Sequence, residues 1–212
     1  MTSEIRAVLW DFGGVILSSP FEAFNRYETE KGLPLNIIRS VNATNPDSNA
    51  WALLERNDIS PAQFDTQFAD ESEALGHRIP GADVLALLSG DVRPAMVAAL
   101  DHVIASGFRT ACLTNNVVST SPDPSPRQIE VAAIMGKFDH VVESSKVGCR
   151  KPEPRFYEIA CELLDVSPTE CVFLDDLGIN LKPAAAMGMR TIKVGAPEIA
   201  LQELSGHIGL TF

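Results

Sequence analysis

Residues 7–17, AVLWDFGGVIL, decide the fold that the rest of this chain is expected to adopt. Residues 7–10 suit a buried strand, because a strand covered on both faces of a parallel sheet is apolar along its length. A single carboxylate, Asp11, follows them. Then come Gly13 and Gly14, which leave the backbone free for strained angles and for close approach to a bound group. Because open α/β sheets hold their ligands at the carboxyl ends of the strands, Asp11 stands where a functional acid is expected.

Beyond residue 93, short apolar segments alternate with helix-like segments. Strands that alternate with helices indicate a parallel, doubly wound sheet. We therefore predict an α/β fold with a Rossmann-like parallel sheet. The predicted strands are residues 110–113, 138–143, 171–174 and 191–194. The predicted helices are residues 94–106, 152–164 and 178–187. One more helix is predicted to end at residue 134, after a Ser- and Pro-rich loop at residues 119–127.

Residues 18–88 interrupt this alternation with helix-like segments and no convincing strand. Ser60 and Pro61 make a good N-cap and first position for one of these helices. A helical stretch inside an α/β pattern is typical of an inserted domain. We predict a core domain of residues 1–17 and 89–212 and an all-helical domain of residues 18–88. The apolar stripe of the helix after Pro61 is predicted to comprise Phe64, Phe68 and Leu75.

The composition argues against several classes of function. A formal net charge of −11 over 212 residues disfavours nucleic-acid binding, which needs a positive surface. Apolar runs fall short of a membrane span, and residues 1–6 carry no signal-peptide core. We expect a soluble, cytoplasmic protein, a monomer or homodimer, that binds neither nucleic acid nor membrane. The cysteines lack zinc-ligand spacing and are expected to be reduced thiols; they are Cys112, Cys149, Cys161 and Cys171.

Polar side chains follow three of the predicted strands, and a lysine precedes a predicted helix. The carboxyl ends of parallel strands meet at one edge of the sheet, so these side chains are expected to converge. Each one alone is most simply a turn or helix-capping residue. Four such positions at a single edge favour a functional site instead. The candidates are Asp11, Thr114, Asn115, Lys151, Asp175 and Asp176.

The chemistry of these groups suits phosphoryl transfer. Clustered acids raise one another's pKa unless a cation holds them. Asp11 with Asp175 and Asp176 would suit Mg²⁺, which takes a few carboxylates and keeps several waters. Lys151 and the Thr114 hydroxyl are donors for phosphoryl oxygens. A carboxylate can also attack phosphorus and form an aspartyl-phosphate, which splits one hard step into two.

Two other phosphate-handling classes share parts of this pattern and are excluded. Residues 11–13 spell the Asp-Phe-Gly triplet of protein kinases, but ten preceding residues cannot hold the lobe and catalytic loop that the triplet needs. A response-regulator receiver also combines an acid pair, an aspartate, a threonine and a lysine. Its acid pair ends the first strand, whereas Asp175 and Asp176 come last here.

With these motifs in order, the sequence resembles the haloacid-dehalogenase-like hydrolases. The family's four motifs match residues 11–15, 114–115, 151–152 and 175–176, in the family's order and spacing. The helical insertion stands where the subclass with a helical cap carries it. Resemblance is greatest to the phosphatase domain at the N-terminus of soluble epoxide hydrolases. The segments that carry it are VGCRKPEP (147–154) and FLDDLGINLKPA (173–184).

The resemblance implies a role for each candidate residue. Asp11 would be the nucleophile, Thr114 and Asn115 would hold the phosphoryl group, and Lys151 would stabilise its charge. The implied metal is Mg²⁺, and Asn180 would orient the acidic loop. The implied metal ligands are Asp11, the backbone carbonyl of Gly13, Asp175, and Asp176 directly or through water.

One position departs from the family pattern. Phosphatases of this family usually carry a second aspartate at position 13, as general acid for the leaving alcohol and general base for the attacking water. Gly13 has no side chain for either task, although it keeps the carbonyl. General acid–base help is typically worth about 10²–10⁴ in rate. The change therefore implies a slower phosphatase, one that favours good leaving groups, or one that borrows an acid from the cap or the substrate.

Three functions remain open from the sequence. The leading one is a Mg²⁺-dependent phosphatase that acts on a small phosphorylated metabolite. The second is a 2-haloacid dehalogenase, whose halide leaving group needs no proton. By resemblance those enzymes lack a metal and carry a Ser-Ser-Asn-type fourth motif, so Asp175 and Asp176 favour the phosphatase. The third is a non-catalytic protein that binds a phospholigand.

Overall fold

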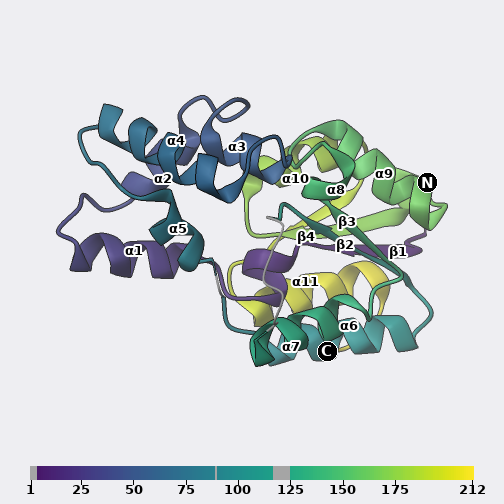
Figure 1. The fold of residues 1–212 in the computed structure, drawn as a ribbon. Helices are drawn as coiled ribbons and strands as arrows, with labels where there is room; N and C mark the ends of the chain where they lie inside the picture. The colour runs from purple at the N-terminus through teal and green to yellow at the C-terminus, as the bar shows by residue number, and fades with distance from the viewer. Residues whose placement is uncertain (1–3, 89, 117–124) are drawn as a thin grey trace. The chain divides into compact units, whose positions relative to one another are not determined.

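A computed structural model gives the fold and describes residues 4–88, 90–116 and 125–212 (Figure 1). The chain divides into two compact units. One comprises Met1–Ser18 and Asp91–Phe212, and the other comprises Ser19–Gly90. Most of the loop predicted at residues 119–127 lies outside the described residues. None of the helices in the described ranges is long and apolar enough to cross a bilayer.

The first unit is built on a five-stranded parallel sheet. Its strand order is β3-β2-β1-β4-β5, so the predicted doubly wound sheet is confirmed. β1 lies at the centre, and its Trp10 is level with Cys112 of β2 and with Leu174 of β4. The strands are β1 (Ala7–Trp10), β2 (Arg109–Thr114), β3 (His140–Glu143), β4 (Cys171–Asp175) and β5 (Arg190–Lys193).

Helices cover both faces of this sheet (Figure 1). Successive residues of a strand point to opposite faces, so β1 contributes to two cores. Val8 and Trp10 pack in the core that includes α6 and α11. Ala7 and Leu9 pack in the core that includes α9 and α10. The helices of this unit are α6 (Pro94–Ala105), α7 (Pro126–Met135), α8 (Ser144–Val147), α9 (Pro154–Leu164), α10 (Gly178–Ala186) and α11 (Pro197–Ile208).

The second unit is helical, with no strand among its described residues. Ser60 caps α4 as predicted, because its hydroxyl accepts from the Gln63 amide while the Gln63 side chain bonds back to Ser60. Phe64 and Phe68 are buried, but the prediction for Leu75 is wrong. Leu75 is the residue after α4 ends and is 41% exposed. The helices are α1 (Phe21–Glu30), α2 (Ile37–Ala43), α3 (Ala50–Glu55), α4 (Pro61–Ala74) and α5 (Gly81–Ala86).

Some element boundaries differ from the prediction for local reasons. The helix predicted from residue 152 begins at Pro154, because a residue that precedes proline is driven out of the helical region. Glu153 accordingly has φ −63° and ψ 127°. The strand predicted from residue 138 begins at His140, since the Phe138 amide donates to the Met135 carbonyl in the turn after α7. α8 and α11 have no counterpart among the predicted helices.

Candidate functional site

The acids predicted to converge lie side by side at one edge of the sheet. Asp11 directly follows β1, and Asp175 is the last residue of the neighbouring β4. The Asp11 amide donates to the Leu174 carbonyl at 2.8 Å, so the two carboxylates leave adjacent strands at nearly the same level. One carboxylate oxygen from each of Asp11, Asp175 and Asp176 lies within 4.8 Å of the other two. Their convergence follows from parallel register.

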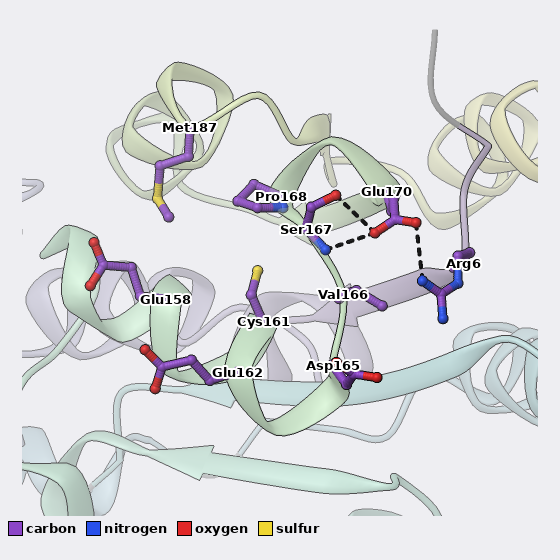
Figure 2. A pocket seen from close by; sticks show the side chains of 10 residues that line it. All are labelled: Arg6, Glu158, Cys161, Glu162, Asp165, Val166, Ser167, Pro168, Glu170 and Met187. Atoms are coloured by element: carbon purple, nitrogen blue, oxygen red, sulfur yellow. Dashed lines mark hydrogen bonds and ion pairs between the residues drawn. The ribbon is translucent and has the colours of Figure 1, made fainter.

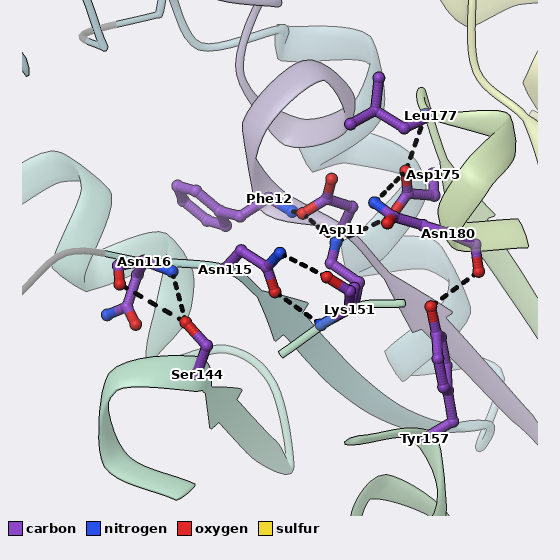
Figure 3. A network of polar contacts seen from close by, with 10 residues as sticks. All are labelled: Asp11, Phe12, Asn115, Asn116, Ser144, Lys151, Tyr157, Asp175, Leu177 and Asn180. Atoms are coloured by element: carbon purple, nitrogen blue, oxygen red, sulfur yellow. Dashed lines mark hydrogen bonds and ion pairs between the residues drawn. The ribbon is translucent and has the colours of Figure 1, made fainter. Parts of the chain in front are cut away.

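Lys151 joins two of these acids (Figure 3). Its Nζ lies 2.8 Å from Oδ1 of Asp11 and 2.8 Å from Oδ2 of Asp175. The lysine side chain is 1% exposed and comes from the segment just before α9. Burial alone would lower its pKa, but the two carboxylates raise the pKa above its ordinary value, so Lys151 carries a positive charge.

Burial and the neighbouring charges together shift the pKa of Asp11. Burial raises the pKa of its carboxyl, the Lys151 ammonium lowers that pKa, and the Asp175 carboxylate raises it, with a net upward shift. A further cation at the site would lower the pKa of Asp11 and favour the ionised form that a nucleophile requires.

The donor set fits a divalent metal ion. Three carboxylates lie close together in a largely buried cluster, and the Lys151 ammonium contacts two of them. Like charges held together away from water are costly. A divalent cation would lower that cost, and carboxylate oxygens are the ligands that Mg²⁺ prefers.

Asn115 contacts the lysine segment through both ends of its amide. Oδ1 accepts from the Lys151 amide at 2.9 Å, and Nδ2 donates to the Lys151 carbonyl at 3.0 Å (Figure 3). These bonds hold the backbone of Lys151, and the contact with the phosphoryl group that the resemblance implied stays a prediction. Thr114 is the buried last residue of β2, two residues beyond Cys112, which pairs with Trp10 of β1.

Asn180 meets the acidic loop as the resemblance implied. Its Nδ2 donates to both carboxylate oxygens of Asp175, each at 3.1 Å. The Leu177 amide also donates to Oδ1 of Asp175 at 2.8 Å. Asp175 is therefore fixed by backbone and side-chain donors as well as by Lys151.

Sequence reasoning missed Tyr157 and Ser144. The Tyr157 hydroxyl donates to the Asn180 carbonyl at 2.7 Å, and burial raises the pKa of this phenol, which keeps its proton. The Ser144 hydroxyl accepts from the Asn116 amide at 3.1 Å, beside Asn115 (Figure 3). Tyr157 lies on the buried, apolar face of α9, where the sequence pattern indicates a core residue and gives no sign of a functional one. The position of Asn116 directly after Thr114 and Asn115 was the available signal for this second network.

The two glycines after Asp11 differ in what their surroundings demand. Gly14 has φ +82°, and a Cβ atom there would overlap the Asp176 carboxylate, so this position requires glycine. Gly13 has φ −73°, is exposed, and a Cβ atom there would have no neighbour within 4 Å. Of the two glycines, Gly14 alone has the positive φ and the close neighbour that a side chain would disturb.

Gly14→Ala is expected to lower the free energy of unfolding by about 1–3 kcal/mol or more. Alanine is strained at the positive φ of this position, and its methyl group would also clash with the Asp176 carboxylate. Urea denaturation measures this loss. Gly13→Ala is the matched control and is expected to change stability by less than about 0.5 kcal/mol. Equal stability of the two variants would contradict the close approach of Asp176 to residue 14.

A depression lies away from this site, around the loop between α9 and β4 (Figure 2). It has a volume of about 560 Å³. Among the described residues that line it, none belongs to the predicted site. Its lining places four carboxylates against one arginine, which disfavours a phosphorylated ligand. The charged residues concerned are Arg6, Glu158, Glu162, Asp165 and Glu170.

Comparisons with known proteins agree with this architecture. Phosphatase MT3486 of Mycobacterium tuberculosis is 32% identical over 203 residues, which cover 90% of this chain and 88% of that protein. Bifunctional epoxide hydrolase 2 of Mus musculus is 31% identical over 219 residues, which cover 98% of this chain and 40% of that protein. The chain spans less than half the length of the mammalian relatives that it matches.

A solved structure shows the same fold. It is that of a HAD family enzyme from Bacteroides thetaiotaomicron in complex with magnesium and inorganic phosphate, with a TM-score of 0.58 and 20% identity. The match covers 91% of this chain and 95% of that one. A family model described as haloacid dehalogenase-like hydrolase matches residues 5–188. By fold and by sequence, this chain belongs to the haloacid dehalogenase-like hydrolase family.

Proposed function

We propose that this hydrolase is a Mg²⁺-dependent phosphatase that acts on a small phosphorylated metabolite through an aspartyl-phosphate intermediate. One observation carries the proposal: Lys151 lies 2.8 Å from both Asp11 and Asp175, within a group of three acids able to hold a metal ion. A relative named as a phosphatase and a structural neighbour that holds magnesium with inorganic phosphate support it.

In the first step, a carboxylate oxygen of Asp11 attacks phosphorus and the bond from phosphorus to the ester oxygen breaks. Asp11 becomes an acyl phosphate, and the ester oxygen leaves with the bonding electron pair as an alkoxide, which takes a proton from solvent water to become the alcohol. Lys151 donates to the phosphoryl oxygens as charge moves onto them, and the Thr114 hydroxyl is the second donor. Asn115 acts on this step by holding the Lys151 backbone in place.

In the second step, a water oxygen attacks the phosphorus of the acyl phosphate. The bond between phosphorus and the Asp11 oxygen breaks, which restores the carboxylate. The attacking water passes one proton to solvent, and its oxygen leaves as part of inorganic phosphate. Mg²⁺, held by Asp11, Asp175, Asp176 and the Gly13 carbonyl, would supply positive charge beside the phosphoryl oxygens. Proton transfer to the leaving alcohol has no side chain at position 13 to perform it.

Phosphate release from a panel of phosphomonoesters tests the proposal. Sugar phosphates, nucleotides and lipid phosphates are each incubated with Mg²⁺ or with a chelator. We expect slow, Mg²⁺-dependent steady-state turnover of at least one small substrate. Absence of phosphate release from every substrate, together with measurable phospholigand binding, would instead identify a non-catalytic binding protein.

The same panel includes 2-chloropropionate, because Gly13 also suits a dehalogenase. A halide leaving group needs no proton, so chloride release that persists with the chelator would favour that function. The acid group of Asp11, Asp175 and Asp176 supports the phosphatase, since a metal-free dehalogenase has no use for three clustered carboxylates.

Gly13→Asp is expected to raise the turnover of alkyl phosphates by about 10² or more, because an acid at this position can protonate a poor leaving group. The position has room and a permitted backbone conformation. Turnover of p-nitrophenyl phosphate should change little, since its leaving group needs no proton. Steady-state kinetics on both substrates measure the difference.

Gly13→Asn is the matched control for that substitution. Asparagine fills the same space and has no proton to transfer, so its alkyl phosphate turnover should stay at the level of the original chain. An equal gain from aspartate and asparagine would show that proton transfer does not limit the rate.

A further inference from the structure

The position of Asp175 depends in part on the first turn of α10, which lacks two of the supports that a helix usually has. Its N-cap, Leu177, makes no side-chain capping bond. Pro183 lies inside the helix and has no N–H, so the carbonyl of Ile179 loses its usual helical partner. Asn180, which bonds to both oxygens of Asp175, belongs to this turn. A hydrogen bond from outside the helix would therefore add to the support of this turn.

Tyr157 provides that support from the neighbouring helix α9. Its hydroxyl donates to the Asn180 carbonyl at 2.7 Å, and the bond is buried (Figure 3). Its ring is fully buried and packs edge-on against Phe173 of β4, with centroids 5.6 Å apart. Phe173 stands two residues before Asp175 on the same strand. Tyr157 thus contacts both the strand and the helix that present the carboxylate.

We infer that the Tyr157 hydroxyl is a positioning group for the metal-binding carboxylate of Asp175, acting through Asn180. The inference rests on the proposed function, because it takes Asp175 to be a metal ligand. Groups that orient a metal ligand without touching the metal affect how tightly the metal binds, because they hold the ligand at the angle that the metal requires. The contribution of Tyr157 is to limit the movement of Asn180.

The test measures metal binding directly in the full chain. Mn²⁺ takes the same oxygen ligands as Mg²⁺, and free Mn²⁺ is counted by electron paramagnetic resonance. Tyr157→Phe keeps the ring and removes only the hydroxyl. We expect it to weaken Mn²⁺ binding about three- to tenfold, the equivalent of one neutral hydrogen bond. Turnover at saturating metal should change less than the metal affinity does.

The matched control is the chain's other tyrosine. The Tyr27 hydroxyl also makes a 2.7 Å bond, to Asp83 in the helical unit. Tyr27→Phe therefore removes a tyrosine hydrogen bond of the same length outside the site, and we expect the Mn²⁺ affinity of this variant to stay within twofold of the original chain. Both variants are measured well below their melting temperatures, so that a general loss of stability is not counted as a loss of binding.

Two more variants decide how each outcome is interpreted. Asp175→Asn is expected to abolish tight binding, and Asn180→Ala to weaken it at least as much as Tyr157→Phe. If Asp175→Asn loses binding while Tyr157→Phe or Asn180→Ala stays within twofold of the original chain, the positioning role is overturned and the metal site stands. If Asp175→Asn also binds normally, the metal site of the proposed function itself fails.

Discussion

Asp11→Asn is expected to lower phosphate release by at least about 10⁴-fold while the protein stays folded. An amide of the same shape cannot attack phosphorus, so the acyl phosphate does not form. The fold tolerates the change because Lys151 keeps its 2.8 Å contact with Asp175. One of three clustered negative charges is also removed. Steady-state phosphate release and thermal melting measure the two effects separately.

Asp165→Asn is the matched control for this loss. Asp165 is 93% exposed in its side chain and lies at the far end of α9, in a left-handed conformation that asparagine also accepts. The turnover of the Asp165→Asn variant should equal that of the original chain. Normal turnover in Asp11→Asn would remove Asp11 from the role of nucleophile.

Lys151→Met is expected to lower the free energy of unfolding by about 3–5 kcal/mol in metal-free buffer. Methionine has a similar length but leaves the buried carboxylates of Asp11 and Asp175 without their shared cation. Breaking a buried ion pair on one side is costly because the remaining charge stays desolvated. Urea denaturation with a chelator present measures the loss.

Lys137→Met, a lysine-to-methionine substitution at the protein surface, is the control. Lys137 pairs with Asp101 at 2.7 Å, but its side chain is 37% exposed. Lys137→Met should cost no more than about 1 kcal/mol, since exposed ion pairs contribute little. The double variant Lys151→Met/Asp11→Asn should be more stable than Lys151→Met alone, because one unpaired carboxylate is gone. Equal losses at Lys151 and Lys137 would contradict the buried pairing.

The sequence alone determined the class of fold and the set of candidate residues. The apolar run at residues 7–10 and the later strands predict a parallel sheet because burial on both faces leaves a local mark on composition. Asp11 and Asp175 were found because each follows such a run, and parallel strands end at the same edge. Only local periodicity was needed for these steps, which is why the helices predicted for residues 94–106, 152–164 and 178–187 also came within a few residues of their observed bounds.

Tertiary structure alone decided which atoms meet. That Gly14 and not Gly13 must be glycine is set by Asp176, which lies 162 positions further along the chain. The Asn115 amide bonds to the Lys151 backbone, and the Tyr157 hydroxyl reaches Asn180 from another helix. Local sequence reports burial and backbone preference, whereas hydrogen-bond partners are fixed by strand register and helix packing. Segments distant in the chain reach these partners only once the sheet has formed.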